Sequence, residues 1–292
     1  MCKKIIIGAT GYVGNVLFSR SKDIGNALGT SSKINDDGLI HFCLDSPLDF
    51  DYSLIESGDV IFLTAAISSP DICKREFDRA WGVNVTGTSE FISKAIKLGA
   101  RVIFFSSDVV YGECDREFDE SYLGSPAGEY AQMKHEVERR FFGNPYFKSI
   151  RLSYVFSHED KFTRYLIESS SKNIVADLFH PFCRAIVHRD DVISGALNLA
   201  DRWNDIPDQI INFGGPQVLS RIDFAECLRE AHLKELRFKV TQPDEAFFYN
   251  RPRVIAMTSP ILEMLLGRAP RSLLNAASLE FEKNKTIRNN HD

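Results

Sequence analysis

The sequence predicts an α/β protein built on a doubly wound parallel sheet, with a smaller C-terminal lobe. Short apolar segments alternate with amphipathic segments of helical length through the first half of the chain. That order produces a parallel sheet covered by helices. A glycine-rich turn joins the first strand to the first helix, and the alternation weakens past about residue 155. At 292 residues and 44% hydrophobic composition, the chain is long enough to bury a large core.

The individual elements follow from local patterns. Apolar runs predict the strands of the sheet at 4–7, 25–29, 39–43, 59–64, 101–106 and 149–154. Amphipathic periodicity predicts helices at 12–20, 70–98 (broken near Gly82) and 128–142. In the second half we expect a helix at 162–174, a loop at 179–182, a strand leading into a helix over 184–192, a strand at 210–213, and a helix at 221–233 with Ser220 as its N-cap.

These elements imply a division into domains. Residues 1–155 would form a Rossmann domain that binds a dinucleotide, with returning segments at about 184–214. Residues 156–183 and 215–270 would form a substrate-binding lobe. The polar tail 271–292 is expected to fray.

Composition excludes several classes of protein. With a net charge of −5 and no dominant basic run, we expect no nucleic-acid partner. No stretch of about 18 apolar residues exists, and the chain enters its first strand at once, so we expect neither a membrane span nor a secretory signal. The six cysteines are scattered without metal-ligand spacing, which predicts reduced thiols, no metal site and a cytoplasmic location.

The glycine turn has the spacing G-x-x-G-x-x-G directly after an apolar strand. Gly8 would permit the tight turn, Gly11 the close approach of the backbone to a pyrophosphate, and Gly14 close packing of helix on sheet. The helix N-terminus behind them would present free N–H groups to the phosphates. We expect a dinucleotide to contact this turn through Gly8, Thr10, Gly11, Tyr12, Val13 and Gly14.

The end of the next strand bears on the choice of cofactor. NAD-binding domains usually place an acidic residue about 20 residues beyond the glycines. Here the segment reads Thr30-Ser31-Ser32-Lys33, and hydroxyls with a lysine suit a 2′-phosphate better than an acid would. The sequence therefore favours NADP over NAD, although Asp36 and Asp37 follow closely.

Two further segments carry chemistry. A buried strand ends on Ser106-Ser107, and Tyr130 and Lys134 stand four positions apart on one face of a later helix. A lysine cation near a phenol favours the phenolate and lowers a pKa that is otherwise about 10. Such a phenol can exchange a proton with a substrate oxygen that a serine hydroxyl holds, which indicates carbonyl–alcohol interconversion. The strand at 59–64 ends in Ala65-Ala66, small enough for a flat cofactor to lie against the backbone.

The whole set of motifs resembles the extended short-chain dehydrogenase/reductase superfamily, and within it most closely the dTDP-4-dehydrorhamnose reductase branch of nucleotide-sugar enzymes. The motifs are GATGYVG at 8–14, Ala65-Ala66, NVTGT at 84–88, SSDVVYG at 106–112, YAQMK at 130–134, RLSYVF at 151–156, VHRDDV at 187–192, NFGG at 212–215 and Arg251-Pro252. Two departures, Ser157 in place of glycine after Val155-Phe156 and Met257-Thr258-Ser259 near the end, put the identity of the substrate in doubt.

The resemblance implies roles for single residues. Tyr130 would be the proton donor, and Lys134 would tune it and hold the nicotinamide ribose. Ser107 would polarise the carbonyl, and Asn84 would shape the site beside the cofactor. Substrate contacts are expected from Ser68, Ser107, Asp108, Val109 and Arg251, the last as a cation for a diphosphate. Arg151 and Glu138 are expected to serve structure, and His188 to be a packed histidine.

Three functions fit these residues. The first is NAD(P)H-dependent reduction of a keto group on a nucleotide-activated sugar of the 4-keto-6-deoxy type. The second is epimerisation on the same scaffold. Dehydration is disfavoured because Asp108 is followed by Val109 where a dehydratase has glutamate. The third is a non-catalytic NADP-binding regulatory subunit, against which Ser107, Tyr130 and Lys134 argue together. Members of the superfamily commonly pair through helices, which leaves a homodimer open.

Overall fold

The computed structural model describes residues 2–34, 36, 38–113 and 116–289, with side chains to residue 282. It divides into two compact units. Unit 1 comprises Met1–Val110, Gly124–Arg151 and Ala196–Ile211, and unit 2 comprises Tyr111–Leu123, Leu152–Gly195 and Asn212–Asp292.

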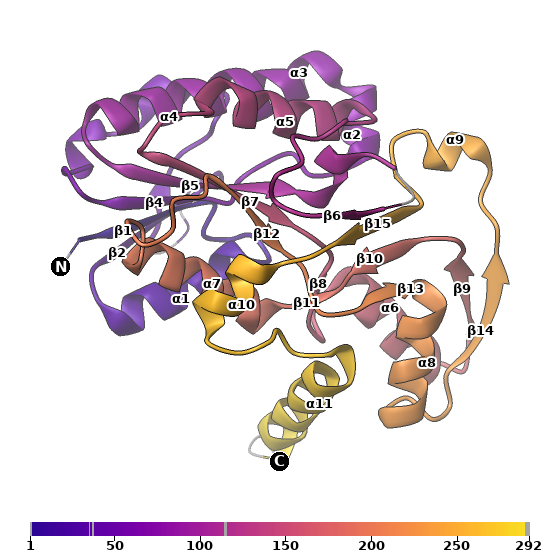
Figure 1. Ribbon diagram of the computed structural model, residues 1–292. Helices are drawn as coiled ribbons and strands as arrows, with labels where there is room; N and C mark the ends of the chain where they lie inside the picture. The colour runs from indigo at the N-terminus through magenta and orange to yellow at the C-terminus, as the bar shows by residue number, and fades with distance from the viewer. Residues whose placement is uncertain (1, 35, 37, 114–115, 290–292) are drawn as a thin grey trace. The chain divides into compact units, whose positions relative to one another are not determined.

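The central sheet has seven strands in the order β12-β7-β5-β4-β1-β2-β3 (Figure 1). The pairs β5–β4, β4–β1, β1–β2 and β2–β3 are all parallel. The order reverses direction on the two sides of β1, so the sheet is doubly wound as predicted. The strands are β1 (Lys4–Ile7), β2 (Ala27–Ser31), β3 (Ile40–His41), β4 (Val60–Leu63), β5 (Arg101–Ser107), β7 (Phe147–Leu152) and β12 (Ile210–Phe213).

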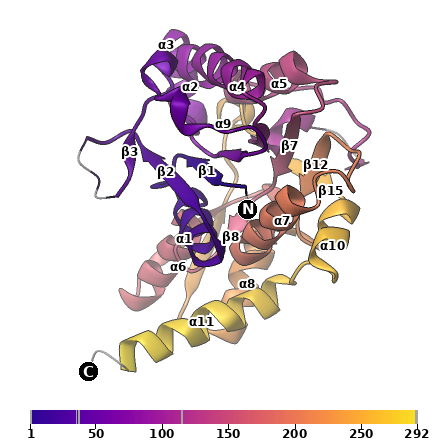
Figure 2. The same ribbon diagram turned by 90° about the vertical axis from the view of Figure 1, so that its left-hand side faces the viewer.

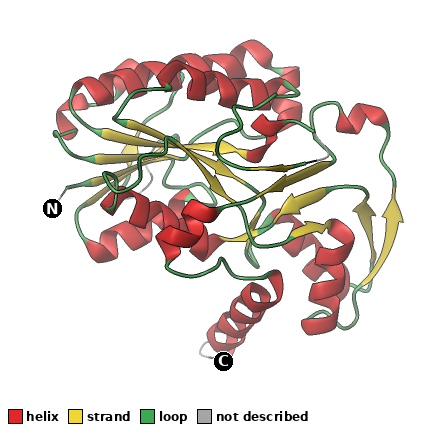
Figure 3. Ribbon diagram, viewed as in Figure 1, coloured by secondary structure: helices red, strands yellow, loops and turns green. Residues whose placement is uncertain are grey.

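Helices cover both faces of this sheet. In Figures 1 and 3, helices α2 to α5 lie over one face and α1 over the other. The helices of unit 1 are α1 (Gly14–Ile24), α2 (Pro70–Arg75), α3 (Phe77–Trp81), α4 (Thr88–Lys97) and α5 (Glu129–Phe141). Helix α7 (Arg189–Asp201) begins in unit 2 and ends in unit 1.

The strands of the sheet are apolar without alternation because helices bury both of their faces. All four residues of β1 and all four of β4 are buried. On one face, Ile5, Ile61 and Phe104 pack with Phe91 of α4 and Val137 of α5 in a single cluster. This core fixes the strand ends from which the candidate site is built.

Most boundaries differ from the prediction by a few residues, and two of these differences bear on the candidate site. Strand β2 begins two residues later than expected, so the predicted 25–29 becomes Ala27–Ser31 and the hydroxyls of Thr30 and Ser31 lie inside the strand. The helical region predicted at 70–98 breaks first at Glu76, which has ψ 49°, and then continues through a π-helical segment, Gly82–Gly87, before α4. The wider turn accommodates Gly87, where a β-carbon would lie 1.6 Å from the carbonyl oxygen of Leu44.

Unit 2 contains smaller sheets and the remaining helices. One sheet has the order β13-β10-β15-β6, and two further pairs are β11–β8 and β14–β9. The strands are β6 (Glu117–Phe118), β8 (Val155–Phe156), β9 (Val175–Phe179), β10 (Cys183–Ala185), β11 (Val187–His188), β13 (Val218–Ser220), β14 (Arg237–Thr241) and β15 (Val254–Met257). The helices are α6 (Lys161–Ser171), α8 (Arg221–Ala231), α9 (Glu245–Phe248), α10 (Pro260–Leu266) and α11 (Leu273–Asn289).

The expectation that the tail at 271–292 frays is wrong for most of its length. Helix α11 occupies Leu273–Asn289 and runs alongside α8 (Figure 2). Its residues Leu273, Ala276 and Ala277 are buried in the core of unit 2. The polar composition hid these apolar positions, which recur at the spacing of one helix face.

A buried carboxylate fastens the same helix. Glu280 accepts hydrogen bonds from the backbone N–H of His158 at 3.1 Å and contacts the imidazoles of His158 (2.6 Å) and His188 (2.9 Å). His188 is only 1% exposed, so the expectation of a packed histidine is confirmed.

Three further observations concern membrane spans, cysteines and metal ligands. None of the helices in the described residues combines the length and apolar character that crossing a lipid bilayer requires. Cys2, Cys43, Cys73, Cys183 and Cys227 are free thiols, and Cys114 lies outside the described residues. The described residues contain no cluster of potential metal ligands.

Candidate active site

The glycine turn after β1 is closely packed, as its spacing predicts. Gly8 has φ +94°, and a β-carbon there would lie 2.9 Å from the backbone nitrogen of Ala65. At Gly14 a β-carbon would lie 2.1 Å from the carbonyl oxygen of Gly8. Only glycine fits both positions, because the turn passes against the end of β4 and α1 starts directly over it.

The same turn leaves backbone groups available to a ligand. Thr10 and Gly11 are exposed, and Tyr12 and Val13 are half-buried where α1 begins. Val13, which precedes the helix, has no side-chain oxygen that could cap it. Two of the first N–H groups of α1 are engaged, since Asn15 donates to the carbonyl oxygen of Gly11 at 2.9 Å and Leu17 to that of Val13 at 3.1 Å. The positive end of the helix still suits the phosphates of a dinucleotide.

The end of β2 differs from its predicted role. Thr30 is 1% exposed, and its hydroxyl oxygen accepts the N–H of Gly8 at 3.1 Å, so it supports the glycine turn. The hydroxyl of Ser31, also 1% exposed, donates to the carboxylate of Asp36. Ser32 and Lys33 are exposed. Asp36 thus places a carboxylate beside the end of β2. Asp37 lies outside the described residues.

The loop after β4 is held by Asn84. The Asn84 side chain accepts the N–H of Ile67 at 2.8 Å and donates to the carbonyl oxygen of Ile67 at 2.9 Å. Asn84 is 2% exposed and lies in the π-helical segment. Both of its polar groups are therefore engaged by the loop that carries Ala65 and Ala66, and its effect on a cofactor would be exerted through that loop. Ser68, in the same loop, is exposed.

The end of β5 places Ser107 and Asp108 together. The Ser107 hydroxyl donates to the Asp108 carboxylate at 3.2 Å and lies 3.4 Å from the backbone nitrogen of Val109. Ser107 and Val109 are half-buried, whereas Asp108 is 4% exposed. Because β5, β4, β1 and β2 are parallel neighbours, the segments that follow them lie at one edge of the sheet.

Helix α5 brings Tyr130 and Lys134 against β5. The ammonium of Lys134 donates to the carbonyl oxygen of Phe105 at 2.7 Å and lies 4.4 Å from the centre of the Phe104 ring. Its distance to the centre of the Tyr130 ring is 5.8 Å. Within the described residues, the Tyr130 hydroxyl has no hydrogen-bond partner, so it remains available to a substrate.

The predicted lowering of the Tyr130 pKa is wrong for this structure. Burial raises the pKa of the phenol, and the charges of Cys73 and Asp108 raise it further. Burial also lowers the pKa of Lys134 to about 8. The lysine is directed at a backbone carbonyl, so the cost of removing a phenolate from water outweighs its attraction.

Cys73 is a neighbour of this site that the sequence did not reveal. Its thiol is fully buried, donates to the carbonyl oxygen of Ile67 at 3.2 Å, and packs with Met133 beside Tyr130. A lone cysteine in a helix carries no sequence signal of its own. Only the fold brings it to the phenol.

Arg251 lies in unit 2, as expected of a substrate-lobe residue. It is half-buried, donates to the side-chain oxygen of Asn250 at 2.8 Å, and lies 4.8 Å from the centre of the Phe247 ring. Its expected contact with a diphosphate stays a prediction.

Comparison with known proteins identifies the family of the chain. The family described as RmlD substrate binding domain matches residues 3–278. A dTDP-4-dehydrorhamnose reductase of Mycolicibacterium smegmatis is 24% identical over 241 residues, which cover 79% of this chain and 70% of the relative.

Solved structures support the same fold. A dTDP-4-dehydrorhamnose reductase from Clostridium acetobutylicum superposes with a TM-score of 0.81 at 20% identity, covering 97% of this chain and 99% of that one. A UDP-glucuronic acid 4-epimerase variant from Bacillus cereus, in complex with a fluorinated UDP-sugar acid and NAD, gives 0.82 at 19% identity, with 98% and 99% covered. A UDP-glucose 4-epimerase from Stenotrophomonas maltophila with bound NAD gives 0.81 at 14% identity over the full length of both chains. The chain belongs to the RmlD substrate binding domain family, whose relatives include NAD(P)-dependent oxidoreductases.

Proposed function

We propose that the protein reduces a keto group on a nucleotide-activated sugar, with NAD(P)H as the hydride source. The observation that carries this proposal is the Tyr130 hydroxyl, which has no protein partner in the described residues and stands beside Asp108 at the end of β5. The relatives named dTDP-4-dehydrorhamnose reductase support a 4-keto-6-deoxy sugar as the substrate class.

The residues of unit 1 fit a dinucleotide. The exposed backbone of Thr10 and Gly11 and the uncapped start of α1 would hold its phosphates. Ala65 and Ala66, held through Asn84, would lie against its flat part, and Lys134 would contact the nicotinamide ribose. When bound, the nicotinamide supplies the hydride, whereas the protein supplies position and polarity.

The cofactor we propose is NAD(H) in preference to NADP(H). Asp36 is hydrogen-bonded to Ser31 at the end of β2, where an acid suits free ribose hydroxyls. This choice replaces the NADP preference drawn from the hydroxyl-rich segment alone, and the NAD complexes among the structural neighbours support it.

Tyr130 would act as an acid. A reduction creates an alkoxide, which is a far stronger base than a phenolate. Tyr130 can therefore protonate the alkoxide as long as its hydroxyl carries a proton before the hydride is transferred. The raised pKa keeps Tyr130 protonated at neutral pH. Ser107 would turn its single O–H from Asp108 to the same carbonyl oxygen and hold it in place.

Epimerisation is the second candidate, because epimerases among the structural neighbours bind NAD and Asp36 favours that cofactor. It begins with oxidation, which needs Tyr130 as a base. The resting Tyr130 is protonated, which suits a reaction that begins with proton donation, and we prefer the reductase.

The test is turnover with NADH and NADPH against a panel of 4-keto-6-deoxy nucleotide sugars, followed by mass spectrometry of the product. We expect a product two mass units heavier, one NADH oxidised per product, and a loss of about 10²–10⁴-fold in rate for Tyr130→Phe. Tyr146→Phe, an exposed tyrosine of unit 1, is the control and should leave the rate unchanged. Isomerised sugar without net NADH oxidation would identify an epimerase instead. Binding of NADH without turnover of any sugar would overturn both.

A further inference from the structure

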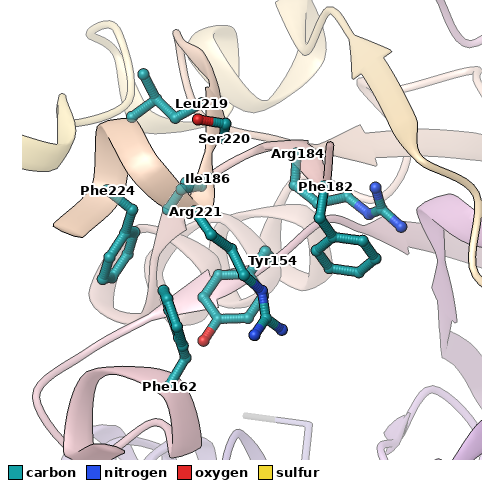
Figure 4. A pocket seen from close by; sticks show the side chains of 9 residues that line it. All are labelled: Tyr154, Phe162, Phe182, Arg184, Ile186, Leu219, Ser220, Arg221 and Phe224. Carbon is teal, nitrogen blue, oxygen red and sulfur yellow. The ribbon is translucent and has the colours of Figure 1, made fainter. Parts of the chain in front are cut away.

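Unit 2 contains a pocket whose walls are largely aromatic and whose polar groups are arginines (Figure 4). It opens between α6, β10, β13 and α8, and we call it the arginine pocket. Its lining residues are Tyr154, Phe162, Phe182, Arg184, Ile186, Leu219, Ser220, Arg221 and Phe224. With its open mouth included, the hollow measures about 260 Å³, below the roughly 300–1,000 Å³ of sites that enclose whole ligands. It therefore suits one group of a larger ligand.

Arg221 occupies the middle of this pocket. Its guanidinium lies 4.4 Å from the centre of the Phe162 ring and 4.9 Å from that of Phe182, and Figure 4 shows it between these rings. Within the described residues it has no hydrogen bond and no ion pair. Arg221 opens α8, and a capping box between Ser220 and Asp223 fixes that helix start.

The other arginine of the pocket is engaged by the protein. Arg184 is 6% exposed and donates to the carbonyl oxygens of Cys183 at 2.6 Å and Pro252 at 2.7 Å. Its charge still adds to the positive potential of the pocket, but its N–H groups serve the backbone. Arg221 is the arginine there with donors to spare.

A carboxylate that acts on Arg221 through its charge, that of Asp160, directs its hydrogen bonds to other groups. Asp160 accepts the Tyr154 hydroxyl at 2.5 Å, the Thr163 hydroxyl at 2.6 Å and the backbone N–H groups of Ser157, Phe162 and Thr163. Burial lowers the pKa of Arg221, Tyr154 and Asp160 raise it, and Arg251 lowers it. A guanidinium does not deprotonate in proteins, so the pocket holds a partly desolvated cation to which Asp160 lends charge without a hydrogen bond.

We propose that the arginine pocket is an oxyanion subsite in which Arg221 binds a phosphate or carboxylate group of the substrate. The inference rests on the proposed function for the nature of the whole ligand, a nucleotide sugar. A planar guanidinium binds such groups through two parallel N–H donors, and the ring faces of Phe162 and Phe182 hold it in orientation. The anion is carried either by the nucleotide diphosphate or by an acidic sugar.

Calorimetric titrations distinguish these sources, using UDP, dTDP, UDP-glucose, UDP-glucuronic acid and free glucuronate as probes without cofactor. The variant is Arg221→Met, which keeps an apolar stem between the rings. Arg221→Lys keeps the charge and removes the planar fork. The matched control is Arg229→Met on the same helix, since Arg229 also stacks on a ring, that of Phe238 at 5.1 Å, but is ion-paired with Glu226.

We expect Arg221→Met to weaken binding about tenfold or more, Arg221→Lys to weaken it less, and Arg229→Met to change it less than twofold. If all nucleotide probes weaken, the pocket holds a phosphate. If UDP-glucuronic acid alone weakens, it holds a sugar carboxylate.

Two results would overturn the subsite: equal affinities of Arg221→Met and wild type for every probe, or no binding of any probe to a folded wild type at millimolar concentration. Neither titration depends on turnover. Sugar reduction with an unchanged KM in Arg221→Met would reject the subsite and keep the reductase. Arg221-dependent binding without reduction of any keto-sugar would reject the reductase and keep the subsite.

Discussion

Removing the carboxylate of Glu138 should destabilise unit 1 more than any exposed charge change on the same helix. Glu138, on α5, is 3% exposed and pairs with Arg151, on β7, which is 1% exposed. The Arg151 guanidinium lies 2.8 Å from one carboxylate oxygen, with its Nε at 3.2 and 3.3 Å, and Ser149 donates to the carboxylate at 3.0 Å. The pair fastens the helix that carries Tyr130 to the sheet.

The magnitude follows from burial. Glu138→Gln leaves a buried guanidinium that cannot lose its proton, and breaking such a pair costs about 3–5 kcal/mol. An unfolding entropy of about 2.1 cal/mol/K per residue gives roughly 0.6 kcal/mol/K for a chain of this length, so Tm should fall by about 5–8 °C. Replacing both partners, Glu138→Leu with Arg151→Met, should recover most of the loss because no unpaired charge remains.

The measurement is urea and thermal unfolding of the wild type, Glu138→Gln, the double variant and Glu136→Gln. Glu136 lies two positions away on α5 and pairs with the partly exposed Arg139 and Arg140 at 2.9 and 2.8 Å. Its loss should cost about 1 kcal/mol or less. A Glu138→Gln variant no less stable than Glu136→Gln, or a double variant as unstable as the single one, would refute the assignment of the pair as the tie between α5 and β7.

Three further changes test other parts of the structure. Gly14→Ala places a β-carbon 2.1 Å from the carbonyl oxygen of Gly8. We expect this variant to lose at least about 1–3 kcal/mol of stability and to bind NADH more weakly in a fluorescence titration. Unchanged NADH binding would contradict the close packing of the turn. Ser220→Ala removes the capping box with Asp223 and should cost about 1 kcal/mol in urea unfolding, so an unchanged midpoint would count against it. Burial lowers the pKa of Lys134 from 10.5 to about 8, so the unfolded chain binds this proton more tightly than the folded chain does. Between pH 8 and 10.5 the free energy of unfolding of the wild type should therefore rise by about 3 kcal/mol relative to that of Lys134→Met. A difference between the two proteins that does not change with pH would show that the ammonium is well solvated.

Local patterns predicted the parts of the molecule that depend on neighbours in sequence. The apolar run before Gly8 and the run before Ser107 became buried parallel strands, and the periodicity around Tyr130 became α5. The N-cap at Ser220 was also correct, because capping needs only a hydroxyl ahead of a helical segment.

Contacts between distant segments could not be read in the same way. The bonds of Asn84 to Ile67 join residues 17 positions apart, and the hydrogen bond from Ser31 to Asp36 is the contact on which the proposed choice of NAD rests. The C-terminal helix was missed because its few core residues, such as Ala276, are small and lie among polar ones. A partner elsewhere in the chain decides each of these outcomes.

The Tyr130 pKa shows why even a correctly placed pair can be misread. At the 5.8 Å between the Lys134 ammonium and the ring centre, attraction to a phenolate is on the order of 3 kcal/mol for an effective dielectric constant of about 20. The spacing of Tyr130 and Lys134, four positions apart on a helix, predicted only this attraction. Burial of the phenol, with Cys73 and Asp108 nearby, works in the opposite direction and prevails.

The same balance sets the resting protonation state of Tyr130, which bears on the proposed reaction. A phenol held protonated is ready to give a proton to a nascent alkoxide, and the phenolate then formed lies near the Lys134 ammonium, which stabilises it. Removing a proton from an alcohol would have to start from that costly phenolate. Burial of Tyr130 therefore suits the protonated state from which the proposed reduction starts, and in that reaction the sugar that leaves the site carries the new hydroxyl.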